Sequence, residues 1–133
     1  IEISKSIISK MRTKAYCIET PCTICETIGI IKHSSLVIAM RLHSLVYAVS
    51  CGVGVIAVKY DPKIDGFMEY FRQSRIADVS TVTPYEMMHL IDDYFSEDSK
   101  SGIMDLCEEM KEKAKRNADI AVEILEKYDN EHK

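Results

Sequence analysis

The chain has 133 residues, of which 47% are hydrophobic, and its formal net charge is −4. This length allows one hydrophobic core of ordinary size and is too short for two, so we expect a single domain over residues 1–133. An acidic chain without a global basic field is a poor candidate for binding nucleic acid or an anionic membrane surface, so any anion site must be local.

Two helices and a short strand are expected at the start of the chain. Apolar residues recur at helical spacing within residues 4–14, and residues 15–19 are predicted to form a short strand. A second helix is expected to begin at Pro21 or Thr23 and to run to His33. The first residues are neither a signal peptide nor an initiator-methionine start, so we expect an excised piece of a longer protein.

The five cysteines do not follow the regular framework of a small secreted scaffold. Cys22 and Cys25 form a C-x-x-C pair, but a zinc site needs further ligands, and only Cys17 and His33 are nearby, at irregular spacing. We therefore expect ordinary buried thiols, no metal and no cofactor. A reducing cytoplasm is the simplest setting, and no apolar stretch approaches the roughly 20 residues that a membrane span needs.

A strand–helix–strand unit is predicted next. Residues 36–40 are a continuous apolar run, as expected of a strand that is buried on both faces. Apolar residues with a period near 3.6 then predict a helix that follows Arg41 and ends at Gly52. Residues 53–58 form the next buried strand. Because a crossover through one helix usually returns the chain beside the first strand, we expect the two strands to be parallel and adjacent.

The same alternation of strands and helices continues after this unit. A turn at residues 60–62 precedes a short helix over residues 64–71, and residues 75–79 are predicted to form a last short strand. Strand-length apolar stretches that alternate with amphipathic segments are typical of a parallel sheet covered by crossover helices. The fold class is therefore predicted to be α/β.

The C-terminal part is predicted to be helical. Thr83 as N-cap and Pro84 open one helix, and a polar break follows at residues 96–102. Residues 103–128 are expected to form a long amphipathic helix with one buried face. The apolar positions of that face are Leu106, Met110, Ala114, Ala121, Ile124 and Leu125.

Arg41 and His43 come directly after the first buried strand of the predicted unit. In an open α/β sheet this is the carboxyl edge, where ligands bind and where the free N–H groups of the next helix favour anions. An arginine grips a carboxylate or phosphate through two hydrogen bonds, and a histidine moves a proton near neutral pH. Lys59, Tyr60 and Lys63 leave the adjacent strand at the same edge, so the sequence predicts one anion pocket there.

A structural role for these residues remains open beside that interpretation. A histidine in an apolar helix is often a hydrogen-bonded core residue, and a lysine in a polar turn is usually solvated. The rule that ligands bind at the carboxyl edge is general and does not single out this edge. The residue types alone name no substrate.

A resemblance to a known family supplies a candidate activity. Residues 37–48, 52–53 and 57–64 read VIAMRLHSLVYA, GV and AVKYDPKI, and they resemble the signature of the polysaccharide pyruvyltransferases, especially the bacterial cell-wall members. The resemblance is specific over residues 36–71 and general over the helical remainder. It implies a Rossmann-like parallel sheet with helices on both faces, as the C-terminal half of a glycosyltransferase-B-like architecture.

The resemblance also implies a reaction and its residues. Members of the family transfer the enolpyruvyl group of phosphoenolpyruvate to two hydroxyls of a sugar, forming a cyclic ketal and releasing phosphate. His43 and Lys63 match the residues that the family implicates in catalysis, and His43 is expected to act as general acid or base while Lys63 and Arg41 hold the donor. The residues expected to bind substrate are Arg41, Ser44, Lys59 and Tyr60.

The expected partners are phosphoenolpyruvate, a glycan acceptor and a missing N-terminal domain of the same protein. That domain would supply a further arginine, so the isolated chain is not expected to turn over. We expect a cytoplasmic protein. An alternative is a location at the inner face of the membrane, with peripheral contact with a lipid-linked acceptor. Gly54 stands where the family commonly has a proline. A sugar-nucleotide domain of a glycosyltransferase and a non-catalytic sugar-phosphate module remain rival interpretations.

Overall fold

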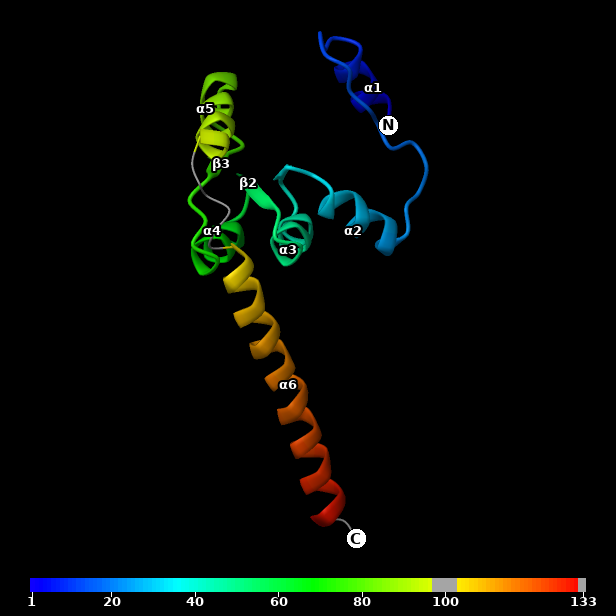
Figure 1. Cartoon of the computed structure of the whole chain (residues 1–133), viewed down its shortest axis with the longest axis vertical. Coiled ribbons are helices and arrows are strands. Elements are labelled where there is room, and N and C mark those ends of the chain that lie inside the picture. The colour runs from blue at the N-terminus through cyan, green and yellow to red at the C-terminus, as the bar shows by residue number, and fades with distance from the viewer. Residues whose placement is uncertain (97–102, 132–133) are drawn as a thin grey trace.

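The computed structural model of the chain describes residues 1–96 and 103–131. Figure 1 shows a small body built around a sheet, from which a long helix extends to the C-terminus. The elements in chain order are α1 (Glu2–Ile8), α2 (Ile24–Lys32), β1 (Leu36–Ala39), α3 (Leu42–Ser50), β2 (Gly54–Lys59), α4 (Pro62–Tyr70), β3 (Ile76–Asp78), α5 (Pro84–Ser96) and α6 (Ile103–Glu131).

The N-terminal segment differs from the prediction in two places. Helix α1 ends at Ile8, before the expected limit, and residues 15–19 are irregular, so the predicted strand there is wrong. The strand fails because this segment pairs with no edge of the sheet, and a strand needs a partner for its backbone. Helix α2 forms as predicted, because the side chains and backbones of Thr23 and Glu26 cap each other at its start.

The three strands form one parallel sheet in the order β1-β2-β3. Leu36 lies opposite Gly54 and Ala39 opposite Ala57, so β1 and β2 are adjacent and parallel, as predicted. Helix α3 crosses between them and is followed by Gly52, whose φ of 72° is the left-handed conformation that glycine favours at a helix end. The predicted α/β class is compatible with this small sheet and the helices around it.

Alternate residues of β2 face two different sets of helices. Val55 and Ala57 join the main core, which Leu45 of α3 and Ile64 of α4 complete. Gly54 points to the other face, where a Cβ would overlap the ring of Tyr94 in α5. The Tyr94 hydroxyl also donates to the backbone oxygen of Ser35 at 2.9 Å. Helices therefore cover both faces of β2.

The prediction that the first strand is buried on both faces is wrong. Ile38 of β1 is 45% exposed, whereas Ile56, its neighbour in β2, is fully buried. Both side chains lie on the face that α5 covers, but α5 packs more closely against β2 than against β1. One face of β1 is therefore open in the part of the chain that the structure describes.

The predicted long helix forms, but its apolar face is buried only at its start. Ile103 and Cys107 of α6 are buried, and the Cys107 thiol lies 2.6 Å from the backbone oxygen of Val49 in α3. Further along, Ile124 and Leu125 are 62% and 64% exposed, so the prediction of one continuous buried face is wrong. The polar break predicted at residues 96–102 lies almost wholly outside the described residues.

Candidate functional site

The carboxyl ends of the three strands meet at one edge of the sheet. Ala39 ends β1, Lys59 ends β2, and Asp78 ends β3, with Lys59 directly opposite Asp78. The residues that follow β1 and β2 therefore leave the sheet at the same edge. This edge is the place where open α/β sheets bind ligands.

A hollow of about 280 Å³ lies at this edge and is lined by Met40, Arg41 and Tyr60. Met40 and Arg41 connect β1 to α3, and Tyr60 connects β2 to α4. Arg41 and Tyr60 are both exposed. The adjacency of the two strands thus brings together two of the residues that the sequence singled out.

Helix α3 presents an uncapped N-terminus at the same edge. Its N-cap residue is Arg41, whose side chain makes no capping hydrogen bond, and its first turn holds no acidic residue. By contrast, Thr23 caps α2 and Asp61 caps α4 through their side chains. His43 is exposed in the first turn of α3, and Ser44 beside it is partly buried. An anion at this position would meet backbone N–H groups, a guanidinium and an imidazole.

Lys63 lies at the start of α4, beside the hollow. Its ammonium is 3.4 Å from the carboxylate of Asp61 and 5.5 Å from the ring centre of Tyr60. The pKa of Lys63 is raised above its ordinary value, chiefly by its hydrogen bond to Asp61, so the side chain is charged at neutral pH. Tyr60 thereby connects Lys63 with the hollow that Arg41 lines.

Lys59 has a close partner within the chain. Its ammonium lies 2.8 Å from the carboxylate of Asp65 in α4, and this hydrogen bond is the main reason that its pKa is raised. Asp78 adds a smaller effect in the same direction. A substrate that binds Lys59 has to compete with Asp65, whereas Arg41 lines an open hollow.

Asp61 links the stability of α4 to pH. The backbone N–H of Lys63 donates to the Asp61 carboxylate at 2.9 Å, and this bond is the main cause of the lowered pKa of Asp61. A lowered pKa stabilises the fold above the ordinary aspartate pKa, and this contribution disappears as the pH falls through the lowered value. We expect Asp61→Ala to lower the midpoint of urea unfolding at neutral pH and to have a smaller effect in acid.

Asp61→Asn is the matched control, because asparagine keeps the capping oxygen without the charge. It should retain most of the midpoint at neutral pH. If the difference between the wild type and Asp61→Ala were the same at neutral and acid pH, the carboxylate charge would have no part in this stability.

A second hollow at the same end of the sheet contains residues that the sequence interpretation missed. It measures about 360 Å³, and its polar lining includes Asp78, Tyr85 and His89. Asp78 lies near the end of the third predicted strand, residues 75–79, and this position is a signal that could have pointed to this part of the edge.

The cysteines differ from their predicted environment. Cys22 and Cys25 are exposed rather than buried, and both are free thiols. Among the described residues, no group of three or more histidine, cysteine or acidic side chains is placed to hold a metal ion. None of the described helices is long and apolar enough to cross a membrane.

Comparison with known proteins assigns a family to the N-terminal part of the chain. The sequence model of the polysaccharide pyruvyl transferase family matches residues 2–62. No curated protein and no solved structure matches the chain significantly. The matched range contains Arg41, His43 and Tyr60, and it ends one residue before Lys63. The resemblance seen in the sequence is therefore confirmed by the match of the polysaccharide pyruvyl transferase family model to residues 2–62.

Proposed function

We propose that this chain supplies part of the active site of a pyruvyltransferase. The enzyme would transfer the enolpyruvyl group of phosphoenolpyruvate to two hydroxyls of a sugar in a cell-surface polysaccharide or its precursor. The observation that carries the proposal is the hollow between Arg41 and Tyr60, beside the uncapped start of α3 and inside the family-matched range.

The donor has the charges that this edge suits. Phosphoenolpyruvate carries a carboxylate and a phosphate, and Arg41 can bind either group through two parallel hydrogen bonds. The N–H groups at the start of α3 add partial positive charge. Lys63 adds a full positive charge beside Tyr60. These groups would hold the donor and neutralise the phosphate as it leaves.

The reaction also needs a proton carrier, and His43 has that role in the proposal. The methylene carbon of the enolpyruvyl group gains a proton and becomes a methyl group. The central carbon forms bonds to two sugar oxygens, and its bond to the phosphate oxygen breaks. The two hydroxyl protons go to the methyl carbon and to the departing phosphate, so atoms and charges balance. His43 would act as general acid or base in this transfer.

The rest of the proposal concerns the whole enzyme. The chain would form the C-terminal, Rossmann-like domain of a glycosyltransferase-B-like architecture, and an N-terminal domain would complete the site and bind the glycan. Ser44, Lys59 and Tyr60 would contribute to substrate binding. The reaction would take place in the cytoplasm, at the inner face of the membrane when the acceptor is lipid-linked.

Donor protection tests this function in the full-length protein. Phosphoenolpyruvate should raise the melting temperature, because a ligand that binds only the folded state stabilises it, whereas a nucleotide sugar should not. Arg41→Gln should remove the protection. Arg12→Gln is the control, because Arg12 is far from the hollow in sequence, and this variant should retain the protection. With a suitable candidate glycan, the enzyme should then release phosphate, and the glycan product should be heavier by one pyruvyl ketal. Protection by a nucleotide sugar but not by phosphoenolpyruvate would overturn the proposal in favour of a glycosyltransferase domain.

A further inference from the structure

The long helix α6 is attached to the body of the protein only near its start. It has 29 residues, and Ile103 and Cys107 are its buried side chains among those described. After the partly buried Met110, its described side chains are exposed. Figure 1 shows the remainder of α6 extending away from the sheet and its covering helices.

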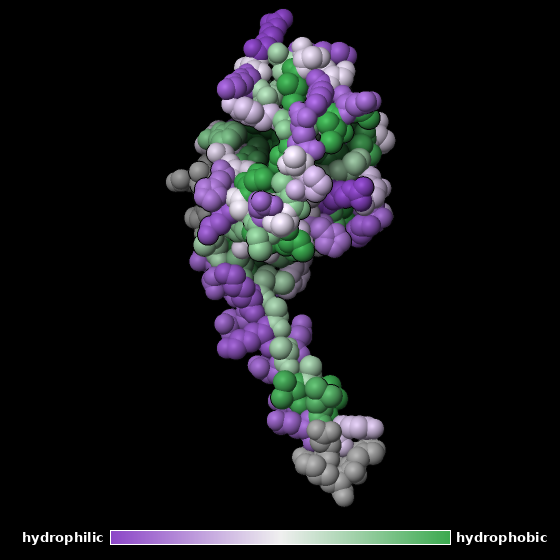
Figure 2. Space-filling view, turned by 90° about the vertical axis from the view of Figure 1, so that its right-hand side faces the viewer, coloured by the Kyte–Doolittle hydropathy of each residue, from purple (hydrophilic) through white to green (hydrophobic). Residues whose placement is uncertain are grey.

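The projecting part of α6 carries a concentration of apolar side chains. The large ones, with their exposed fractions, are Ile120 (43%), Val122 (53%), Ile124 (62%), Leu125 (64%) and Tyr128 (59%). Figure 2 shows a strongly hydrophobic cluster near the far end of the helix, separated from the body by a stretch in which polar side chains lie beside weakly hydrophobic ones. Contiguous exposed apolar residues of this kind mark interaction surfaces.

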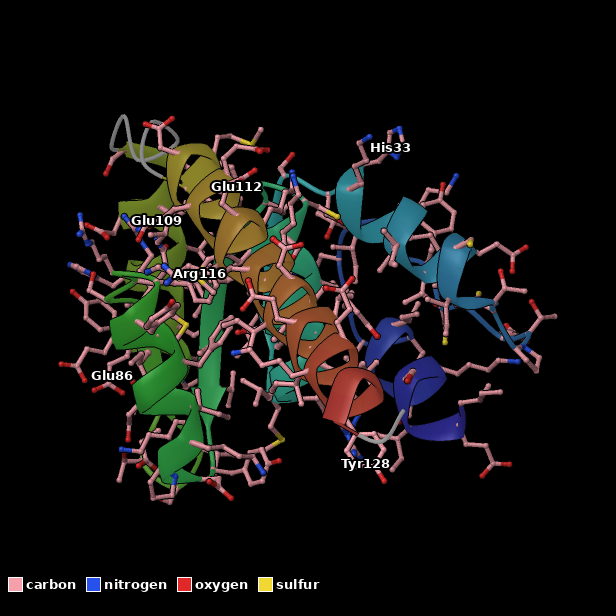
Figure 3. All side chains as sticks on the ribbon, turned by 90° about the horizontal axis from the view of Figure 1, so that it is seen from below. His33, Glu86, Glu109, Glu112, Arg116 and Tyr128 are labelled. Carbon is pink, nitrogen blue, oxygen red and sulfur yellow. The ribbon has the colours of Figure 1, made fainter. Side chains whose placement is uncertain are left out.

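Leu125 and Tyr128 of the cluster lie on the side of α6 that packs against the body, Val122 and Ile124 flank that side, and Ile120 points elsewhere. Ala114, Ala121 and Leu125 follow Cys107 after 7, 14 and 18 residues, which are close to whole numbers of helical turns. The apolar stripe therefore continues from the buried start of the helix to its exposed end. In Figure 3, which views the molecule from below, Glu109, Glu112 and Arg116 project from the first half of α6 and Tyr128 lies near its free end.

We propose that the projecting half of α6 pairs with the same helix of a second copy, in antiparallel orientation and centred on Ala121. The small side chains of one helix then lie opposite the large ones of the other. In this register Ala114 is level with Tyr128 of the second copy, and Ala118 is within one residue of the level of Leu125 of the second copy. Such alternation of small and large residues lets two helices approach closely and fill the space between them.

The charges beside the stripe favour the same arrangement. Lys115 and Glu126 flank the same side of the stripe. The antiparallel register therefore places Lys115 of one copy beside Glu126 of the other. Within one helix they are 11 residues, or roughly 16 Å, apart and do not meet. On the other side of the stripe, Lys113 of one copy approaches Lys127 of the second copy. The carboxylate of Glu109 in the same helix already neutralises Lys113, with 2.7 Å between the carboxylate oxygen and the ammonium.

A parallel pair fits this sequence less well. It would place alanine opposite alanine at positions 114, 118 and 121, which leaves space unfilled, and it would crowd two folded bodies at one end. The antiparallel pair places the bodies at opposite ends of the helices. A two-fold axis through Ala121 makes the interface self-complementary, as closed dimers require.

The mass of the protein in solution tests this pairing. Light scattering during size-exclusion chromatography should show a dimer that dissociates on dilution between about 100 and about 1 µM. Leu125→Glu should weaken the dimer by at least about a hundredfold, because it buries a charge at the centre of an apolar interface. Met88→Glu replaces an apolar residue that is 55% exposed on α5 and should leave the dimer unchanged. Circular dichroism verifies that each variant remains folded.

A charge exchange tests the orientation. Lys115→Glu and Glu126→Lys should each weaken the dimer about three- to tenfold. The double variant should recover the original affinity, because the exchanged charges again form opposite-charge pairs between the two copies. A monomer at every concentration would overturn the proposal. A dimer that survives Leu125→Glu, or a double variant that does not recover, would overturn it as well. The test uses no substrate, so its outcome is independent of the proposed function.

Discussion

Replacement of His43 by alanine is expected to lower the kcat of pyruvyl transfer by about 10²–10⁴-fold, which is the usual contribution of a positioned proton carrier. His43 is exposed in the first turn of α3, and the side chain buries no core contact that the substitution would remove. The loss should therefore appear in catalysis rather than in folding. Phosphate release by the full-length enzyme measures it, with unfolding followed in parallel.

His89→Ala is the matched control for this experiment. His89 is also an exposed histidine on a helix, but it lines the other hollow. Its replacement should leave kcat within a few-fold of the wild type. Lys63→Ala provides a contrast. Its contact with phosphoenolpyruvate would be present both before and during the reaction, so its loss should raise KM for phosphoenolpyruvate more than it lowers kcat. Normal turnover by His43→Ala would remove His43 from the mechanism.

Replacement of Leu45 by alanine is expected to lower the free energy of unfolding by about 2–5 kcal/mol. Leu45 is fully buried on α3, the helix that also carries His43. Its side chain packs with Val55 and Ile64 in the main core, so truncation leaves a cavity between the sheet and its covering helices. Urea unfolding monitored by circular dichroism measures the change.

Met88→Ala is the control for the core substitution. Met88 is 55% exposed on α5, and its truncation should change stability by less than about 0.5 kcal/mol. If Leu45→Ala and Met88→Ala had equal effects, α3 would not be held to the sheet through this core. The position of His43 at the carboxyl edge would then need another explanation.

Gly54 illustrates how tertiary packing explains a sequence departure. The family resemblance leads one to expect a proline at this position, and the sequence alone gives no reason for glycine. In the structure the ring of Tyr94 occupies the space where any Cβ at Gly54 would lie. Tyr94 also binds Ser35 through its hydroxyl, at 2.9 Å. The glycine therefore permits α5 to approach β2 closely.

The local elements and their order were determined by the sequence. The mutual capping of Thr23 and Glu26, and that of Thr83 and Glu86, start helices where predicted, because the interacting residues are three positions apart. Gly52 follows the end of α3 because glycine readily adopts the left-handed conformation at a helix end. The adjacency of β1 and β2 also follows from the sequence, since a single crossover helix leaves few alternatives. Recognition of the family rested on the sequence motifs at residues 37–48, 52–53 and 57–64.

The tertiary structure alone decided which apolar and charged groups find partners. Hydrophobic periodicity predicts that Ile38 and Leu125 are buried, yet both are exposed, because burial depends on whether another element covers that face. Lys59 and Lys63 flank the same turn, but Asp65 of α4 holds Lys59, whereas Lys63 lies beside Asp61 and over the ring of Tyr60. Such contacts join residues whose separation and geometry are set by the fold, so no local pattern encodes them.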